Sequence, residues 1–338
     1  MTFSPRKLLL PLVPFYRLAL ALRELRLGTR FEPVCRLHFP VVSIGNLSAG
    51  GAGKTPTVIA LAQALMRRGL HVDVLSRGYG RESQLPARVG PDGTYDEFGD
   101  EPLLIARETG APVYVAPLRY EAGLLAEAES AAVSLSRVHL LDDGFQHRQL
   151  FRDVNILLID RGDWRDWLLP AGNLREPLRA ARRATVMAIP AEDPEPNEPD
   201  FETVLRAWGW QGPVWRLHRT MQVPTVHGPV VAFCGIARPE QFFAGLESTG
   251  LHLAARFAFP DHHPYSAADR ERLLAAARQA GAAALVTTEK DRVRLGHLAA
   301  AGPDTIPLET AGLRVEIERE DEAVDWLLAR IIQSSKAK

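Results

Sequence analysis

The chain has 338 residues, enough for about two domains, and its 46% hydrophobic and 24% charged residues are typical of a globular protein with a large core. A net charge of −1 argues against a nucleic-acid binder, which usually carries a basic excess. Two cysteines, Cys35 and Cys234, exclude a disulfide framework and a paired-cysteine zinc motif, which fits a reducing compartment. Nothing in the composition indicates an obligate protein partner.

The segment 1–36 differs from the rest of the chain in charge, with seven basic and two acidic side chains. Its apolar run LLLPLVPFYRLALAL, 8–22, is interrupted by Pro11, Pro14 and Arg17 and falls short of the roughly 20 apolar residues that span a bilayer. A signal peptide also begins this way, but no small-residue cleavage site follows. Leucines followed by arginines favour a helix lying on an anionic membrane surface; the alternative is a helix packed on its own protein.

Strands and helices are then expected to alternate. Glycine-rich and charged residues at 81–99 predict a long surface loop. The expected strands are 38–46, 71–80, 112–116, 137–145, 154–160 and 184–190, and the expected helices are 54–69, 100–110 and 119–130. This order predicts an α/β fold, a mostly parallel sheet with helices on both faces. The glycine-rich loop at 48–55 makes the expected fold P-loop NTPase-like.

The proline-rich, acidic stretch PAEDPEPNEPD, 190–200, predicts a domain boundary, after which the alternation resumes. Strands are expected at 229–236, 251–259 and 283–291, and helices at 239–249, 266–280 and near 320–333. We therefore expect a membrane-interface segment (1–36), a first α/β domain (37–189), a linker (190–227) and a smaller α/β domain (228–338).

The stretch SIGNLSAGGAGKTP, 43–56, differs from the phosphate-loop pattern G-x-x-x-x-G-K-[ST] because Ser48 stands where that pattern has glycine. A strand precedes it and a helix follows, and its glycines let backbone N–H groups converge on an anion at the helix N-terminus. Lys54 is one of only five lysines among 40 basic residues, which favours a specific role on phosphate. The alternative is a glycine-rich turn. The predicted phosphate-binding residues are Ser48, Ala49, Gly50, Gly51, Ala52, Gly53, Lys54 and Thr55.

Two aspartates end the strand VHLLDD, where carboxylates of a parallel sheet point into the ligand crevice. Mg²⁺ prefers one or two carboxylates together with phosphate oxygens, and the Thr55 hydroxyl is a further candidate ligand. Asp142 and Asp143 are therefore candidate metal ligands, without a choice between them. The alternative is a pair of turn aspartates before Gly144.

Seven motifs in this order resemble the tetraacyldisaccharide 4'-kinase (lipid A 4'-kinase) family: GNLSAGGAGKTP, SRGYG, GDEP, DDGFQHR, LPAGNLREP, FPDHH and TTEKD. They extend from about residue 41 to 291, and this family tolerates serine at position 48. The resemblance implies transfer of the γ-phosphate of ATP, with Mg²⁺, to the 4'-hydroxyl of an acylated glucosamine disaccharide 1-phosphate, giving lipid IVA. It also implies work at the cytoplasmic face of the bacterial inner membrane.

The resemblance further implies that Asp100 of GDEP and His262 of the DH motif activate the hydroxyl, although His263 is adjacent. The plain alternatives are a helix cap for Asp100 and a solvated loop or metal cluster for DHHP. Lys290 is a candidate for contact with nucleotide or with the domain interface. The substrate-side candidates are Arg77, Tyr79, Glu101, Arg119, Arg175 and Glu176.

Two other classes of function are weighed against this one. A GTPase requires Asn/Thr-Lys-x-Asp for guanine, and TTEKD places lysine directly before aspartate, so that spacing fails. A non-catalytic, ATP-dependent membrane regulator would keep Lys54 and Asp142 but have no use for Asp100 or His262.

Overall fold

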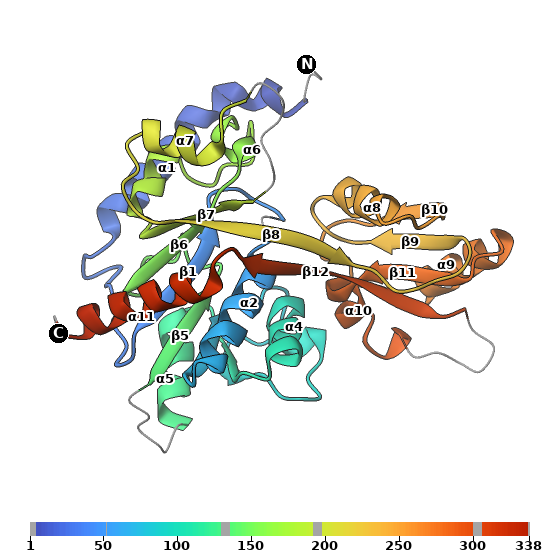
Figure 1. Ribbon diagram of the computed structural model, residues 1–338, viewed down its shortest axis with the longest axis horizontal. Helices are drawn as coiled ribbons and strands as arrows, with labels where there is room; N and C mark the ends of the chain where they lie inside the picture. The colour runs from blue at the N-terminus through green and yellow to red at the C-terminus, as the bar shows by residue number, and fades with distance from the viewer. Residues whose placement is uncertain (1–4, 52, 130–135, 192–197, 300–305, 337–338) are drawn as a thin grey trace.

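The computed structural model describes residues 5–51, 53–129, 136–191, 198–299 and 306–336, and these build one twelve-stranded sheet (Figure 1). The strand order is β10-β9-β11-β12-β8-β7-β6-β1-β5-β2-β4-β3. The strands are β1 (Val41–Asn46), β2 (His71–Ser76), β3 (Ala87–Arg88), β4 (Val113–Val115), β5 (Arg137–Asp142), β6 (Val154–Leu158), β7 (Val186–Pro190), β8 (Val214–Gln222), β9 (Val230–Cys234), β10 (Leu253–Ala258), β11 (Ala284–Thr288) and β12 (Leu308–Ile317).

Helices cover both faces of this sheet (Figure 1). The α-helices are α1 (Val13–Arg26), α2 (Lys54–Arg67), α3 (Tyr95–Phe98), α4 (Asp100–Thr109), α5 (Arg119–Glu129), α6 (Arg161–Trp164), α7 (Phe201–Ala207), α8 (Pro239–Ser248), α9 (Ala267–Gln279), α10 (Glu289–Leu295) and α11 (Glu320–Lys336). Three 3₁₀ helices are η1 (Pro5–Leu12), η2 (Leu178–Arg183) and η3 (Gly296–Ala299).

Strands β1 to β8 form the N-terminal half of the sheet, with β1 between β5 and β6 and parallel to both. Successive side chains of a strand point to opposite faces, and here both faces are covered. Val42 and Ile44 pack with α2, α4 and α11 on one face, whereas Val41 packs with α5 on the other. The predicted mostly parallel α/β sheet with helices on both faces is confirmed.

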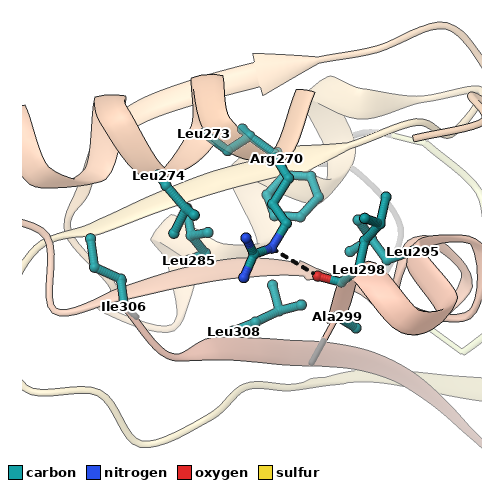
Figure 2. Close-up of a pocket in the computed structure, with 10 residues that line it drawn as sticks. Arg270, Leu273, Leu274, Leu285, Leu295, Leu298, Ala299, Ile306 and Leu308 are labelled. Carbon is teal, nitrogen blue, oxygen red and sulfur yellow. Dashed lines mark hydrogen bonds between the residues drawn. The ribbon is translucent and has the colours of Figure 1, made fainter. Parts of the chain in front are cut away.

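Strands β9 to β12 form the C-terminal half of the sheet and are parallel to one another. Here α8 covers one face and α9 the other. Figure 2 shows a small cavity of about 30 Å³ in the apolar layer under α9, where the Arg270 Nε donates to the Leu298 carbonyl at 3.0 Å. This cavity has room for little more than a water molecule, so it is part of the core and not a substrate site.

The two halves are joined by β8 and β12, which pair antiparallel from Leu217 with Ile317 to Gln222 with Gly312. Figure 1 shows both strands running from one half into the other. The range 190–227, predicted as a linker, therefore contains α7 and β8. After β12 the chain returns, and α11 packs on α2 and β6 of the N-terminal half.

A buried ionic cluster lies between β2, β5 and α5, away from the carboxyl ends of the strands. The Nδ1 of His139 is 3.2 Å from Asp73 Oδ2, and its Nε2 is 3.3 Å from Glu127 Oε1. Arg137 also donates to Asp73 at 2.5 Å. Burial alone would lower the pKa of His139, but the two carboxylates raise it above its ordinary value, so the charged imidazolium is favoured.

Replacing His139 with alanine is expected to lower the free energy of unfolding by about 3 kcal/mol at pH 6, because the buried Asp73 and the partly buried Glu127 lose a partner. The folded-state pKa of His139 is raised, so its stabilisation is complete below the unfolded pKa of about 6.5 and is lost as pH rises through the folded-state pKa. Urea unfolding at pH 6 and pH 9 measures this. The exposed His218→Ala is the control, and an equal loss for His139→Ala at both pH values contradicts the assignment.

Candidate functional site

The glycine-rich loop connects β1 to α2 at the carboxyl edge of the sheet. Gly50 and Gly53 have φ values of 91° and 76°, in the left-handed region that favours glycine. A Cβ at Gly50 would lie 3.1 Å from the Ala237 Cβ, so the loop after β9 packs closely over this one. Ala52 lies outside the described residues. The loop has the strand-loop-helix setting and the exposed backbone of a phosphate-binding loop.

Ser48 is tied into the base of the loop. It is 1% exposed, and its hydroxyl accepts a hydrogen bond from the Asn46 Nδ2 at 3.0 Å. The next residue, Ala49, donates its N–H to the Asn173 carbonyl at 2.7 Å. The side chain at position 48 thus points into the protein and bonds Asn46 at the end of β1. This explains how a serine fits where the general pattern has glycine.

Lys54 begins α2 and points back across the loop. Its ammonium is 3.2 Å from Asn46 Oδ1 and 3.7 Å from Asp143 Oδ1. Arg175 binds the same Asp143 with two hydrogen bonds of 2.9 and 3.0 Å. Burial would raise the pKa of Asp143, but Lys54 and Arg175 lower it to about 2, so Asp143 is an anion already matched by two cations.

Asp142 ends β5 and has a different environment from its neighbour. It is 2% exposed, and its Oδ2 accepts from the Ser76 hydroxyl at 3.1 Å. Its Oδ1 is buried without a hydrogen-bond partner. Burial, Glu101 and Asp143 raise the pKa of Asp142 to about 7. A buried carboxylate oxygen that lacks a donor fits a divalent cation, so Asp142 is the better candidate ligand of the two aspartates.

The rest of the donor set is small. Thr55 lines the same cleft as Asp142. Within the part of the chain that the structure describes, no group of three or more His, Cys, Asp or Glu side chains is arranged to hold a metal ion. Mg²⁺ commonly binds one or two protein carboxylates and completes its shell with waters and substrate phosphates, so Asp142 and Thr55 fit such an ion.

Asp100 and His262 meet although they come from different halves of the sheet. Asp100 opens α4 and is 1% exposed, and its Oδ2 is 3.4 Å from the Nδ1 of His262. His262 has a φ of 57° and lies against the ring of Tyr79, with a centroid distance of 4.8 Å. The Asp100 carboxylate raises the pKa of His262 above its ordinary value. Burial would raise the pKa of Asp100, but His262 and Arg294 outweigh it and lower that pKa.

His263 faces away from this pair. Its Nε2 is 3.1 Å from Asp269 Oδ2, and its ring stacks on Phe259 with a centroid distance of 4.7 Å. Of the two adjacent histidines, His262 is therefore the one that lies beside Asp100.

A basic wall lies beside the loop and includes Arg77, Arg119, Arg175 and His147. Arg119 is 7% exposed, its Nε is buried without a hydrogen-bond partner, and burial lowers its pKa to about 10. Burial and Arg119 lower the pKa of His147 to about 3, so this imidazole is neutral. The buried guanidinium of Arg119, which has an open donor, is suited to an anion.

The remaining substrate-side candidates differ in position. Glu101 faces the cleft and accepts from Lys290 at 2.5 Å. Burial would lower the pKa of Lys290, but Glu101 and Asp100 raise it, so the ammonium is charged. Glu176 is 9% exposed, binds Arg183 at 2.6 Å and lies outside the cleft lining.

Both halves of the sheet contribute to one cleft of about 830 Å³, within the range of small-molecule sites. The N-terminal half supplies the glycine-rich loop, the aspartates and the basic wall. The C-terminal half supplies apolar side chains such as Ile236, Phe242 and Leu313, with Arg238 and Gln241, and β8 adds Met221 and Arg219 where the two halves join. The arrangement suits a ligand with a polyanionic part beside Lys54 and an apolar part on the C-terminal half.

Sequence reasoning did not single out Arg23, His147 or Arg219, all of which line the cleft. Arg23 lies on α1 and donates to the Gln146 carbonyl at 2.8 Å, which fastens the N-terminal segment to the rim of the cleft. His147 and Gln146 belong to the DDGFQHR motif, so that motif was the available signal. No comparable motif marks Arg23 or Arg219.

Comparisons with known proteins agree with this geometry. A family profile described as tetraacyldisaccharide-1-P 4'-kinase (LpxK) matches residues 5–332. The tetraacyldisaccharide 4'-kinase of Koribacter versatilis is 43% identical over 304 residues, 87% of this chain and 89% of the relative. That of Polaromonas naphthalenivorans is 38% identical over 334 residues, 96% of this chain and 92% of the relative.

A solved structure is similar over nearly the whole chain. It is the crystal structure of LpxK from Aquifex aeolicus, described as the "apo" form in complex with ATP. It has a TM-score of 0.74 and 33% identity, and the similarity covers 97% of this chain and 99% of that chain. The match of sequence and fold over both halves leads to one conclusion: the chain belongs to the tetraacyldisaccharide-1-P 4'-kinase family and is an enzyme of that family.

Proposed function

We propose that this enzyme transfers the γ-phosphate of ATP to the 4'-hydroxyl of an acylated glucosamine disaccharide 1-phosphate. The observation that carries the proposal is one cleft lined by the glycine-rich loop, Lys54 and His262, with the buried Asp100 3.4 Å from His262 Nδ1. Family membership and the ATP complex of the Aquifex aeolicus relative support the donor, and the names of the relatives support the acceptor.

Each part of the cleft has a role in this proposal. Backbone N–H groups of the glycine-rich loop and the ammonium of Lys54 hold the phosphates of ATP. Asp142 and Thr55 would hold a Mg²⁺ ion, which neutralises phosphate charge when bound. Arg77 and Arg119 offer cationic donors to the acceptor, whose 1-phosphate is an anion.

The acceptor hydroxyl is a weak nucleophile, so a positioned base assists it. In the proposed step the hydroxyl oxygen forms a bond to the γ-phosphorus, the bond to the leaving ADP oxygen breaks, and the hydroxyl proton passes to the Asp100–His262 pair. Because the two residues come from different halves of the sheet, we expect the pair to depend on how the two halves are positioned over the cleft.

A direct product assay tests the proposal. Purified protein is incubated with ATP, Mg²⁺ and a detergent-dispersed acylated disaccharide 1-phosphate, and the lipid is analysed by mass spectrometry. A mass gain of one phosphoryl group, located at the 4'-position by fragmentation, is expected. ADP release without lipid phosphorylation would instead support an ATP-dependent regulator.

The N-terminal segment supports a membrane setting. Helix α1 has no buried residue, and it exposes apolar side chains beside arginines. The exposed fractions are 71% for Phe15, 58% for Leu18, 52% for Leu22 and 75% for Leu25. None of the helices in the described ranges combines the length and apolar character needed to cross a bilayer. We propose that this segment rests on the cytoplasmic face of the inner membrane. The hydrogen bond from Arg23 to the Gln146 carbonyl holds the segment beside the cleft, so the cleft would lie close to an acylated sugar in the membrane.

The variant Leu18→Glu/Leu22→Glu is expected to bind anionic phospholipid vesicles about 100-fold more weakly, since each leucine contributes about 1.5 kcal/mol on burial. Co-sedimentation with vesicles of phosphatidylglycerol and phosphatidylethanolamine measures this. The matched control is Met66→Glu/Leu124→Glu, which changes two exposed apolar residues on α2 and α5. Equal vesicle binding by both variants contradicts a membrane role for α1.

A further inference from the structure

Arg294 on α10 is a buried cation that contacts Asp100 of the proposed catalytic pair. Its side chain is 1% exposed, and its Nε and Nη2 both lie 2.7 Å from Asp100 Oδ2. Asp100 belongs to α4 in the N-terminal half, so this contact crosses from one half of the sheet to the other. The sequence carries no motif that singles out this arginine.

The same guanidinium also reaches the segment that carries His262. Its Nη1 donates to the Gly235 carbonyl at 2.6 Å, and the backbone N–H of His262 donates to that carbonyl at 3.1 Å. A Cβ at Gly235 would lie 3.0 Å from the Pro260 carbonyl oxygen and 3.3 Å from the Arg294 Nη1, so the packing there is tight. One side chain therefore contacts both members of the pair, Asp100 directly and His262 through a shared carbonyl.

Arg294 is itself held in place by Asp291. Its Nη1 donates to Asp291 Oδ1 at 2.9 Å. Asp291 also accepts from the Tyr265 hydroxyl at 2.9 Å, the Gly235 N–H at 3.0 Å and the Thr288 hydroxyl at 2.6 Å. A guanidinium bound on both sides by buried carboxylates has little freedom to rotate, which is the property required of a group that orients others.

We propose that Arg294 is a positioning residue for phosphoryl transfer, which holds the Asp100 carboxylate and the His262 segment in the geometry that accepts the hydroxyl proton. The inference rests on the proposed function of the Asp100–His262 pair. It assigns no contact between Arg294 and the transferred group.

The charge of Arg294 also affects the ionisation of the pair. The charged and titratable groups around Asp100 are Tyr95 on α3, Asp261 and His262 on the segment after β10, and Lys290, Asp291 and Arg294 on α10. Arg294 and Lys290 both lower the pKa of Asp100. Removing the charge of Arg294 is therefore expected to move the acid limb of the pH–rate profile to higher pH.

Two substitutions separate charge from geometry. Arg294→Gln removes the positive charge and the guanidinium geometry. Arg294→Lys keeps the charge but loses the planar group that bonds Asp100 and Asp291 at the same time. We expect kcat to fall about 100-fold in each, as for a misplaced catalytic group, with the KM for ATP within about twofold of wild type. The acid limb is expected to move upward in Arg294→Gln and to stay near the wild-type position in Arg294→Lys.

The matched control is Arg314→Gln. Arg314 on β12 also joins the two halves, through Glu108 at 3.1 Å and Glu289 at 2.7 Å, but touches neither Asp100 nor His262. It is expected to keep the wild-type kcat. If Arg294→Gln does not fold, Arg294→Lys gives the decisive result, because a wild-type kcat in that variant overturns the inference.

The Asp100→Asn background distinguishes the two proposals. In that background Arg294→Lys is expected to cause no additional loss of kcat, since the group it positions is already absent. A full additional loss, or an equal loss in Arg314→Gln, overturns the positioning role. If Asp100→Asn alone keeps the wild-type kcat, the proposed catalytic pair fails regardless of Arg294.

Discussion

Replacing Lys54 with alanine is expected to lower kcat by about 10²–10³-fold, because a fixed ammonium is removed from the place where phosphate charge develops. Lys54 lies 3.2 Å from Asn46 Oδ1 and 3.7 Å from Asp143 Oδ1, so these two side chains restrict the position of its ammonium. Loss of the ammonium also leaves Asp143 with Arg175 as its main cationic partner. Steady-state kinetics with the lipid acceptor measure the effect.

Lys54→Arg is the informative companion to this variant. It keeps the positive charge, but a planar guanidinium is larger than an ammonium and requires a different approach to phosphate oxygens. We expect it to recover less than a tenth of the lost kcat, in keeping with a point charge at a crowded loop. Full recovery by arginine would show that only net charge matters there, and a wild-type kcat for Lys54→Ala would remove Lys54 from the mechanism.

Asp100→Asn and His262→Asn are each expected to lower kcat by about 10²–10⁴-fold, the usual contribution of a positioned acid–base group. Asparagine has nearly the volume of Asp100, but it is smaller than the imidazole of His262 and loses the ring contact with Tyr79. The two residues lie 3.4 Å apart and act on one proton in the proposed step. The kcat of the double variant is therefore expected to lie within about threefold of the kcat of the less active single variant.

The control for this pair is His263→Asn. His263 is adjacent in sequence but faces Asp269 and Phe259, so a wild-type kcat is expected. Losses that multiply in the Asp100→Asn/His262→Asn double variant would mean that the two residues act independently. Far-ultraviolet circular dichroism and thermal melting of each variant separate loss of catalysis from loss of fold.

The N-terminal half of the sheet was predictable because its strands are buried on both faces and its helices end with clear signals. Strand β1 is buried at every position, and the apolar run 38–46 predicts it to within a few residues. The same holds for β5 and for α2, which begins directly after Gly53. These elements place the phosphate loop and the two aspartates, so that part of the site also follows from the sequence.

Strands β8 and β12 were missed, and they determine how the two halves meet. In β8 buried Trp215 and Leu217 alternate with polar residues, but the proline-rich stretch before them indicated a linker. Near its C-terminal end β8 faces the cleft, so Arg219 and Met221 replace the apolar pattern of a core strand. Period-two patterning is weak in a strand that serves as both core and ligand surface.

Contacts between distant segments could not be predicted from spacing alone. The sequence places Asp100 and His262 in separate motifs, and the pairing of β8 with β12 and the packing of α10 on α4 bring them together. The role of Arg294 is hidden for the same reason, since its partners are 194 and 59 residues away along the chain. Residues that are adjacent in a motif can also lie apart in the site. Glu176 follows Arg175 in the sequence, but it bonds Arg183 and does not line the cleft.

The most direct test is a crystal structure of this protein with a non-hydrolysable ATP analogue and Mg²⁺. We expect the triphosphate to lie on the loop from Gly50 to Gly53, with the Lys54 ammonium on its phosphate oxygens and the γ-phosphate facing the Asp100–His262 pair. An analogue bound elsewhere, with the loop empty and Lys54 still on Asp143, would contradict this account of the enzyme.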